Sequence, residues 1–154
     1  MQKIVINKRY GGFSLSPLAV KRLAELNGKE CYFFKLSLNR GPDRYEPITV
    51  GDAYETMMWV AFSVPNPLDV LPPEIHGPDG TYKGFNEKYR EIDLDSRPDN
   101  RSDPLLIRVV EELGGAANGE CAELKIVEIP DGIEWEIDEY DGMETIHEKH
   151  RSWG

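Results

Sequence analysis

Long hydrophobic runs are missing from this sequence. No apolar stretch comes near the roughly 20 residues that a membrane-spanning helix needs. The opening residues, Met1–Asn7, alternate apolar and polar side chains and contain no signal-peptide core. We therefore expect a cytoplasmic protein without membrane contact, and we expect its opening residues to form a strand.

Cysteine and histidine are scarce as well. Cys31 and Cys121 form neither a CxxC pair nor a disulfide framework, so we interpret them as reduced, buried thiols. Glu144, His147 and His150 would share one face of a helix, a spacing that suits a metal ion, but the sequence is not an HExxH motif. A solvated acidic tail is the simpler interpretation. We expect no metal site, and a metal-dependent hydrolase is kept as an alternative.

Recognisable catalytic motifs are also missing. The chain has no GxGxxG or Walker loop, and no serine or cysteine lies in a nucleophile elbow. We therefore favour a binding protein over an enzyme, and we expect no cofactor.

Acidic residues outnumber basic ones, which gives a net charge of −10. Residues 1–40 carry +6 and residues 120–154 carry −8. The simplest interpretation is that the two ends lie side by side and neutralise each other. The overall sign argues against direct nucleic-acid binding, because affinity for phosphates needs a basic surface.

Length and composition predict a single domain over residues 1–154. A chain of 154 residues with 40% hydrophobic residues can form one core. Its irregular part is a proline-rich insertion at about residues 40–100, which holds eight prolines. Within it, residues 57–64 and 89–94 suggest strands, and we expect most of the remainder to be loop.

Secondary structure is clearest near the two ends of the chain. Strands are predicted over residues 3–9 and 30–38. Between them, Ser16 and Pro17 begin a helix, because serine accepts from free N–H groups and proline has none to lose. Asn27–Gly28 ends that helix.

The C-terminal third predicts a helix and two strands. Asp103 and Pro104 begin the helix, which ends at Gly114–Gly115. Residues 122–129 and 133–140 alternate as strands do, and the turn at 130–132 suggests that they pair as a hairpin. Residues 143–150 are predicted as a short helix.

The resulting order is β-α-β, loops and short strands, then α-β-β and a short α. This order predicts an α+β fold with a mixed or antiparallel sheet and two main helices on one face. Strand order stays open, because the leading β-α-β unit can also form a parallel pair.

Two segments share a pattern with known sequences. Lys3–Ser16 reads KIVINKRYGGFSLS, and the stretch from Asp103 to Arg151 includes DPLLIRVVEELG and LKIVEIPDGIEWEIDEYDG. Together they resemble a family of small uncharacterised proteins from bacteriophages and prophages. The resemblance implies a phage context, inside an infected or lysogenic bacterial cell, and it assigns no site residues. Small accessory phage proteins often modulate host machinery or host defence.

The candidate ligand site is the glycine loop, Tyr10–Ser14, between the first strand and the first helix. Free N–H groups near a helix start favour anions, and Gly11 and Gly12 permit close approach of a ligand. Lys8 and Arg9 add charge, and an aromatic side chain can stack on a base. The alternative is a tight turn whose aromatic side chains enter the core. The full set of candidate ligand-binding residues is Lys8, Arg9, Tyr10, Gly11, Gly12, Arg101, His150 and Arg151.

Acidic side chains alternate along the last predicted strand. Glu134, Glu136 and Asp138 share one face, and such a ladder can imitate the phosphates of a nucleic acid. They can also serve as paired acid and base if their environments separate their pKa values. The commonest arrangement is a solvated face opposite Ile133, Trp135 and Ile137.

Two functional hypotheses follow from these observations. The first is a phage accessory protein that binds a small anionic, nucleotide-like ligand and sequesters a host immune signal. The alternative is an acidic inhibitor that binds a host defence protein or a nucleic-acid-processing protein. Whether the chain forms a homo-oligomer is left open.

Overall fold

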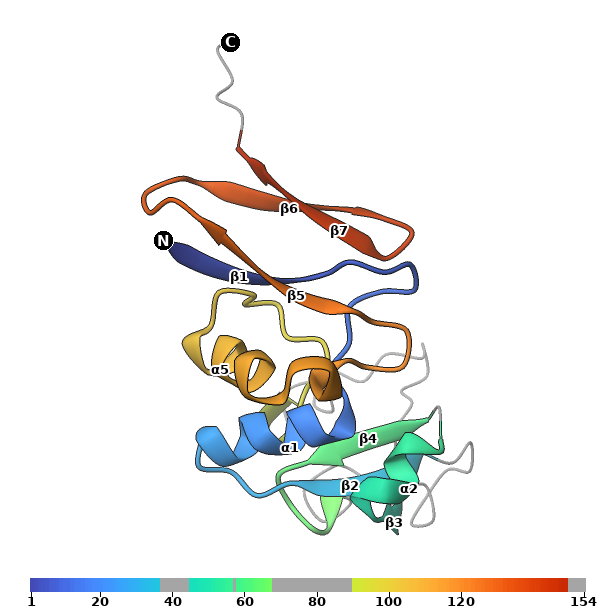
Figure 1. The fold of residues 1–154 in the computed structure, drawn as a ribbon. Coiled ribbons are helices and arrows are strands. Elements are labelled where there is room, and N and C mark those ends of the chain that lie inside the picture. The colour runs from blue at the N-terminus through green and yellow to red at the C-terminus, as the bar shows by residue number, and fades with distance from the viewer. Residues whose placement is uncertain (37–44, 57, 68–89, 150–154) are drawn as a thin grey trace, which may run out of the picture. The chain divides into compact units, whose positions relative to one another are not determined.

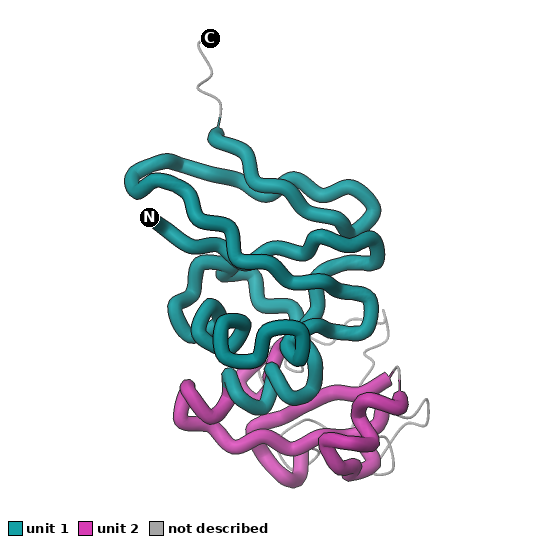
Figure 2. The backbone as a smooth tube through the Cα atoms, viewed as in Figure 1, with its two compact units in different colours: residues 1–23, 96–154 teal, residues 24–95 magenta. Residues whose placement is uncertain are grey.

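The structure is a computed structural model that describes residues 1–36, 45–56, 58–67 and 90–149. Its fold is α+β, as predicted, and every strand pair in the described residues is antiparallel. The chain divides into two compact units (Figure 2), unit 1 with residues 1–23 and 96–154 and unit 2 with residues 24–95. The assignment of one domain to the whole chain stays a prediction. No helix in the described residues is long and apolar enough to cross a membrane.

Unit 1 is built around its first strand. β1 (Gln2–Asn7) pairs antiparallel with β5 (Leu124–Ile129), with Val5 opposite Ile126. α5 (Pro104–Leu113) packs on one side of this pair, and the β6–β7 hairpin lies on the other (Figure 1). β1 is covered from both sides, which explains why its apolar residues are consecutive and why Val5 has no exposed surface.

Both predicted helix starts are confirmed. α1 (Pro17–Leu26) begins in unit 1 after Ser16, whose Oγ accepts a hydrogen bond of 3.2 Å from the Ala19 N–H. α5 begins after Asp103, whose carboxylate accepts from the Leu105 N–H at 3.0 Å. Leu106, Ile107, Val109 and Val110 of α5 are buried, and a short 3-10 turn, η1 (Gly114–Ala117), follows.

The C-terminal strands correct two predictions. β6 (Trp135–Tyr140) pairs with β7 (Met143–Glu148), so residues 143–148 form a strand and not a helix. β5 pairs with β1 and not with β6. The physical reason lies in the Asp141–Gly142 turn, where both residues have positive φ (54° and 91°), as in the two-residue turns that join antiparallel strands.

The three-stranded sheet of unit 2 has the order β3-β2-β4. β2 (Tyr32–Leu36) lies between β3 (Tyr45–Ile48) and β4 (Trp59–Phe62). β2 and β4 agree with the predicted strands. The described strands therefore form three separate sheets, whereas the sequence predicts one sheet with two helices on its face.

β3 and the helix α2 (Val50–Tyr54) lie in the proline-rich segment that was expected to be mostly loop. Pro47 lies in β3, which is an edge strand, and proline is tolerated there because an edge strand has N–H groups without ladder partners. The strand predicted at 89–94 is also wrong in its described part. Residues 90–92 are helical, and only Asp93 forms a bridge, with Phe62.

The core of unit 2 joins these elements. It consists of Phe34, Tyr45, Phe62 and Ile92, with Tyr32 and Leu36 packed against it. The alternating residues Tyr32, Phe34 and Leu36 of β2 therefore share the face that contributes to this core, as expected of the strand predicted at 30–38, whose last two residues lie outside the described residues.

Candidate functional site: the glycine loop and the acidic hairpin

The glycine loop packs against the turn of the β6–β7 hairpin. Gly11 and Gly12 both have positive φ, and the Gly11 N–H donates to the Asp141 carbonyl at 3.1 Å. A Cβ on Gly142 would overlap the backbone of Gly11 and Gly12. The close approach that these glycines permit is therefore occupied by the hairpin turn, at least on the face of the loop that meets Gly142.

Most N–H groups near this loop already have partners within the chain. The Lys8 N–H donates to the Glu123 carbonyl at 2.8 Å, and the Arg9 N–H donates to the Asn7 side chain at 3.2 Å. Leu15 and Ser16 also donate to carbonyls of unit 1. The helix itself starts only at Pro17, so the glycines do not lie at its N-terminus.

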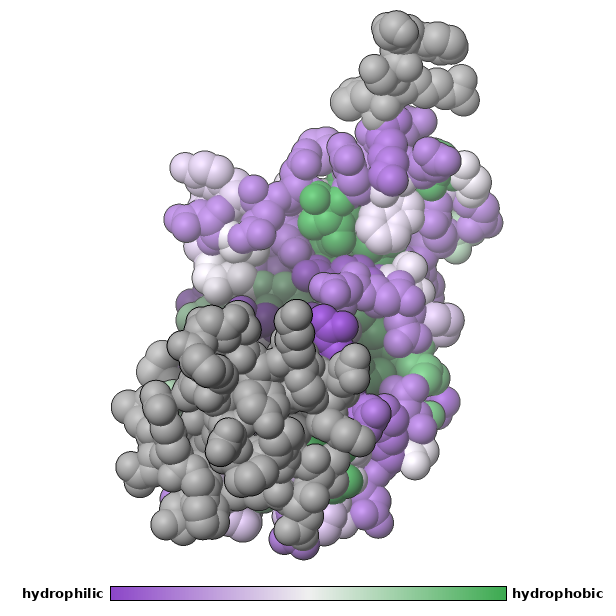
Figure 3. Space-filling view, turned by 180° about the vertical axis from the view of Figure 1, so that it is seen from behind, coloured by the Kyte–Doolittle hydropathy of each residue, from purple (hydrophilic) through white to green (hydrophobic). Residues whose placement is uncertain are grey.

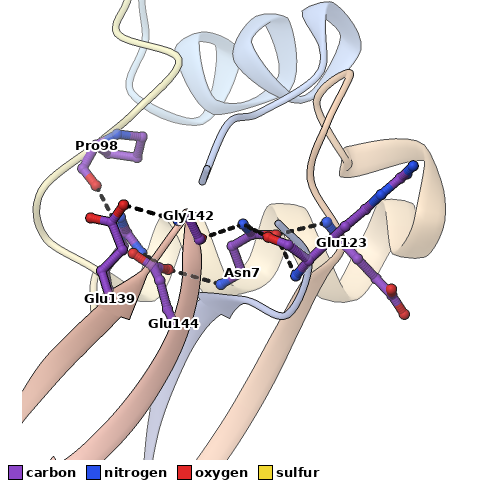
Figure 4. A network of polar contacts seen from close by, with 8 residues as sticks. Asn7, Pro98, Glu123, Glu139, Gly142 and Glu144 are labelled. Carbon is purple, nitrogen blue, oxygen red and sulfur yellow. Dashed lines mark hydrogen bonds and ion pairs between the residues drawn. The ribbon is translucent and has the colours of Figure 1, made fainter. Parts of the chain in front are cut away.

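Asn7 is the centre of a buried polar network (Figure 4). Its side chain donates to the carbonyls of Arg9 (2.7 Å) and Gly142 (2.8 Å), and it accepts from the Glu123 N–H at 2.9 Å. Its backbone N–H donates to Glu144 Oε1 at 2.8 Å. Asn7 has no exposed surface. It therefore joins β1, the start of β5 and the hairpin, a role that the sequence analysis missed. The sequence pattern that could have indicated this role is a polar residue, Asn7, directly after the apolar residues of the first strand.

Arg101, a predicted ligand-binding residue, belongs to this network. Its Nη1 donates to Glu144 Oε1 at 2.6 Å, and its Nε donates to the Pro98 carbonyl at 3.0 Å. The guanidinium lies over the Phe13 ring, 3.5 Å from its centroid. The side chains of Arg101 and Glu144 are only 14% and 8% exposed. The charge of Arg101 is thus compensated inside unit 1.

The remaining predicted cations lie on the surface of the loop. Lys8 and Arg9 are exposed, and neither side chain makes an ion pair within the described residues. Tyr10 is 56% exposed and meets Tyr140, 77% exposed, edge to face at 6.5 Å. Phe13, by contrast, is buried. The structure thus brings Lys8, Arg9 and Tyr10 together with Gly11 and Gly12, whereas His150 and Arg151 lie outside the described residues.

The acidic side chains lie on the outer face of the hairpin. The register places Glu136 opposite His147 and Asp138 opposite Thr145. Glu134, Glu136 and Asp138 are exposed, while Ile133, Trp135 and Ile137 are half-buried, so the acidic residues form a solvated face. On this face His147 Nε2 lies 3.3 Å from Asp138 Oδ2, and Lys149 is paired with Glu134 through a backbone hydrogen bond.

The basic N-terminal residues do not neutralise this face. The Met1 amine forms an ion pair at 2.9 Å with Asp131, in the turn that precedes the hairpin. Lys3 and Arg22 pair instead with Glu111 and Glu112 of α5. Within unit 1, β1 pairs with β5 and contacts β7, so the first and last strands lie close together, but Lys3 and Arg22 do not pair with the acidic face. Figure 3 shows hydrophilic side chains over the part of unit 1 that carries the hairpin.

The proposed metal-binding helix does not form. Glu144 and His147 lie on β7, three positions apart, so their side chains point to opposite faces of the strand. No group of three or more candidate metal ligands exists in the parts of the chain that the structure describes. Neither cysteine forms a disulfide, but Cys121 is exposed and Cys31 is partly exposed, so their assignment as buried was wrong.

Comparisons with known proteins identify no relative of this chain. No protein-family model matches the chain, and searches of curated proteins and of solved structures give no match either. The resemblance to phage proteins therefore stays a prediction.

Proposed function

We propose that this chain is a non-enzymatic binding protein whose β6–β7 hairpin engages a basic surface of a partner protein. The observation that supports it is the charge on the hairpin. Residues 130–149, which are the hairpin and the turn that precedes it, contain eight acidic side chains and one lysine. Seven of the eight acids are exposed, and the exception is Glu144.

Hydrogen bonds between the hairpin region and the rest of unit 1 add to this support. Contacts at both ends fix it to unit 1, through Gln2, whose amide donates to the Pro130 and Ile133 carbonyls, and through Asn7. A face held in one geometry loses little conformational entropy when it binds. Opposite charge also accelerates association and disfavours wrong partners.

The class of partner follows from the spacing of the charges. Alternate residues on a strand are about 7 Å apart, so Glu134, Glu136 and Asp138 form a regular row of negative charge. A basic groove that binds a nucleic-acid backbone is the complementary surface. The resemblance to phage proteins suggests that the protein with this groove is a host defence protein or a nucleic-acid-processing protein.

The test is capture of a partner from bacterial lysate with immobilised protein. We expect capture to weaken steeply with salt, because screening shortens the reach of exposed charges. The variant Glu134→Lys/Glu136→Lys/Asp138→Lys should lose capture while its circular dichroism stays unchanged.

The matched control carries the same change of net charge in unit 2, as Glu46→Lys/Glu55→Lys/Glu91→Lys. These three acids are exposed and make no ion pair within the described residues. Capture that survives the hairpin reversal, or that both triple variants lose equally, would rule out a specific role for the hairpin.

We also propose a second function, binding of a small anionic, nucleotide-like ligand at the glycine loop. The observation that favours it is the pair of exposed tyrosines, Tyr10 and Tyr140, near Lys8 and Arg9, whose side chains make no ion pair within the described residues. Exposed aromatic rings stack on bases, and adjacent cations attract phosphates. This function has less support than the first, because Arg101 and most loop N–H groups are already occupied.

Isothermal calorimetry across a panel of nucleotides tests this second function. Arg9→Glu should weaken binding at least about tenfold, as the loss of a charge-assisted hydrogen bond implies. Mass spectrometry after heating should also detect released nucleotide in protein purified from cells. Normal affinity in a folded Arg9→Glu protein would remove this loop as the site.

A further inference from the structure

β6 has a free edge of backbone hydrogen-bonding groups. Within the described residues its only strand partner is β7. The Lys149 N–H donates to the Glu134 carbonyl at 3.0 Å, which makes residues 134 and 149 a hydrogen-bonded pair. Such pairs alternate along antiparallel strands. The N–H and C=O groups of Trp135, Ile137 and Glu139 therefore point away from β7, toward the edge.

These edge groups make no backbone hydrogen bond within the described residues. The opposite edge of the hairpin, on β7, differs in this respect. There Glu144 binds the Asn7 N–H, and β7 contacts β1. Of the two hairpin edges, the one on β6 is open to another strand.

The two faces of β6 define what such a strand would carry. Glu136 and Asp138 are exposed on one face, and Trp135 and Ile137 are half-buried on the other. Figure 3 shows hydrophobic atoms among the hydrophilic side chains at the level of the hairpin. Side chains of an added strand alternate between the same two faces, so basic residues would meet the acids while apolar residues extend the apolar face.

We propose that the edge of β6 binds an extended segment of the partner, in which basic and apolar residues alternate, by strand addition. This inference rests on the proposed function, since it specifies how the acidic hairpin engages its partner. Main-chain hydrogen bonds would provide affinity, and charge complementarity would select the segment.

A second copy of the chain is disfavoured as the occupant. Antiparallel pairing of two β6 strands about Ile137 would place Glu136 of each copy directly opposite Asp138 of the other. Like charges directly opposite each other destabilise a strand pair. Charge on an edge strand is a common protection against self-association.

A synthetic peptide of alternating lysine and valine, of about ten residues, is a suitable probe, because natural strands reach that length. Its binding to the full chain would be measured by fluorescence anisotropy at low salt. Two further peptides carry N-methyl groups on either all lysines or all valines. Their charge is identical, but each isomer blocks a different edge of the peptide. We expect one isomer to bind about tenfold more weakly than the other, because only one edge pairs with β6.

A pair of protein variants tests the same edge from the other side. Glu139→Pro removes an outward N–H, and Glu139→Ala keeps it, while both lose the hydrogen bond between the Glu139 carboxylate and the Gly142 N–H. Melting temperatures would establish that both variants fold. We expect weaker peptide binding by the proline variant only.

The outcomes separate this inference from the proposed function. Equal binding of the two N-methylated isomers would overturn strand addition, even if charge reversal at Glu136 and Asp138 still abolished capture. If charge reversal has no effect on either peptide or partner, the proposed function itself fails. Sedimentation that shows a dimer broken by Glu139→Pro, but not by Glu139→Ala, would assign the edge to a second copy and overturn the proposal.

Discussion

Asn7 shows how one polar residue can fix the position of several segments. It ends a strand whose other inner residues are apolar, and its side chain binds backbone groups of Arg9, Glu123 and Gly142. Buried polar groups must find hydrogen bonds, and here every partner is a backbone group that lacks a strand or helix partner. The side chain thus substitutes for secondary structure where β1 ends.

The variant Asn7→Ala should lose about 2–4 kcal/mol of unfolding free energy, because it leaves the Gly142 carbonyl and the Glu123 N–H without partners. Urea denaturation followed by tryptophan fluorescence measures this. The control is Glu120→Ala, at an exposed side chain without an ion pair in the described residues, and it should change stability by less than about 0.5 kcal/mol. A similar, small effect of both substitutions would contradict the role assigned to Asn7.

The Arg101–Glu144 ion pair is more buried than the other ion pairs found in the described residues. Arg101→Met alone should destabilise the protein by about 3–5 kcal/mol, since it leaves Glu144 buried and unpaired. The double variant Arg101→Met/Glu144→Gln should recover part of that loss, as a double-mutant cycle would measure.

The exposed ion pair Lys3–Glu111 is the control, and its coupling energy is compared with that of Arg101–Glu144. Its atoms are 3.5 Å apart and its side chains are 39% and 48% exposed. The coupling energy of this pair should be below about 1 kcal/mol. Equal coupling in the two cycles would show that burial does not govern the Arg101–Glu144 pair.

At the scale of elements, the hairpin depends on its two-residue turn. Gly142 has φ 91° and leaves no room for a Cβ against Gly11 and Gly12, whereas Gly132 has φ 82° and open space around it. Gly132→Ala should cost about 1 kcal/mol for backbone strain alone. Gly142→Ala should cost about 2 kcal/mol or more, because the turn must also move away from the loop. Thermal melts of both variants measure the difference, and equal losses would show that the close contact contributes nothing.

The helices of unit 1 are joined by a carboxylate whose pKa is shifted. Hydrogen bonds from Arg22 and then from Arg108 lower the pKa of Glu112 below its ordinary value of 4.5. A lowered pKa contributes stability above the ordinary value, and this contribution is lost as the pH falls through the folded-state pKa. The loss therefore takes place below about pH 4.5.

We expect the stability difference between wild type and Glu112→Gln to be present at neutral pH and to disappear in that acidic range. Urea titrations at several pH values would measure it. Glu128→Gln, at an exposed acid without an ion pair in the described residues, should show no such dependence. A difference for Glu112→Gln that stays constant down to low pH would contradict the assignment.

At the scale of the molecule, the acidic hairpin adds to a net charge that is already negative. Glu134→Lys/Glu136→Lys/Asp138→Lys changes the net charge from −10 to −4. The variant should be at least as stable as wild type at low ionic strength, because self-repulsion falls, and the gain should vanish at high salt. Unfolding measured at two salt concentrations tests this. A large destabilisation would mean that the row of acids is part of the fold and not a binding surface.

Local chemistry in the sequence determined the helix starts and most strands. Ser16, Asp103 and the prolines after them specify where helices begin, since caps act within one turn. The alternation of Glu134, Glu136 and Asp138 with apolar residues specified a strand with one solvated face. The sequence also contains Asp141–Gly142, a pair typical of two-residue hairpin turns. The strand after it was missed because residues 143–150 were predicted as a helix.

Only the tertiary structure decided which strands pair and which charges are free. Strand pairing depends on contacts between β1 and β5, more than a hundred residues apart, and no local pattern records them. Arg101 and Arg9 have the same chemistry in the sequence, yet Arg101 is buried against Glu144 and Phe13 while Arg9 is exposed. Whether a charged side chain is available to a partner depends on what the fold places beside it, and the sequence alone does not contain that information.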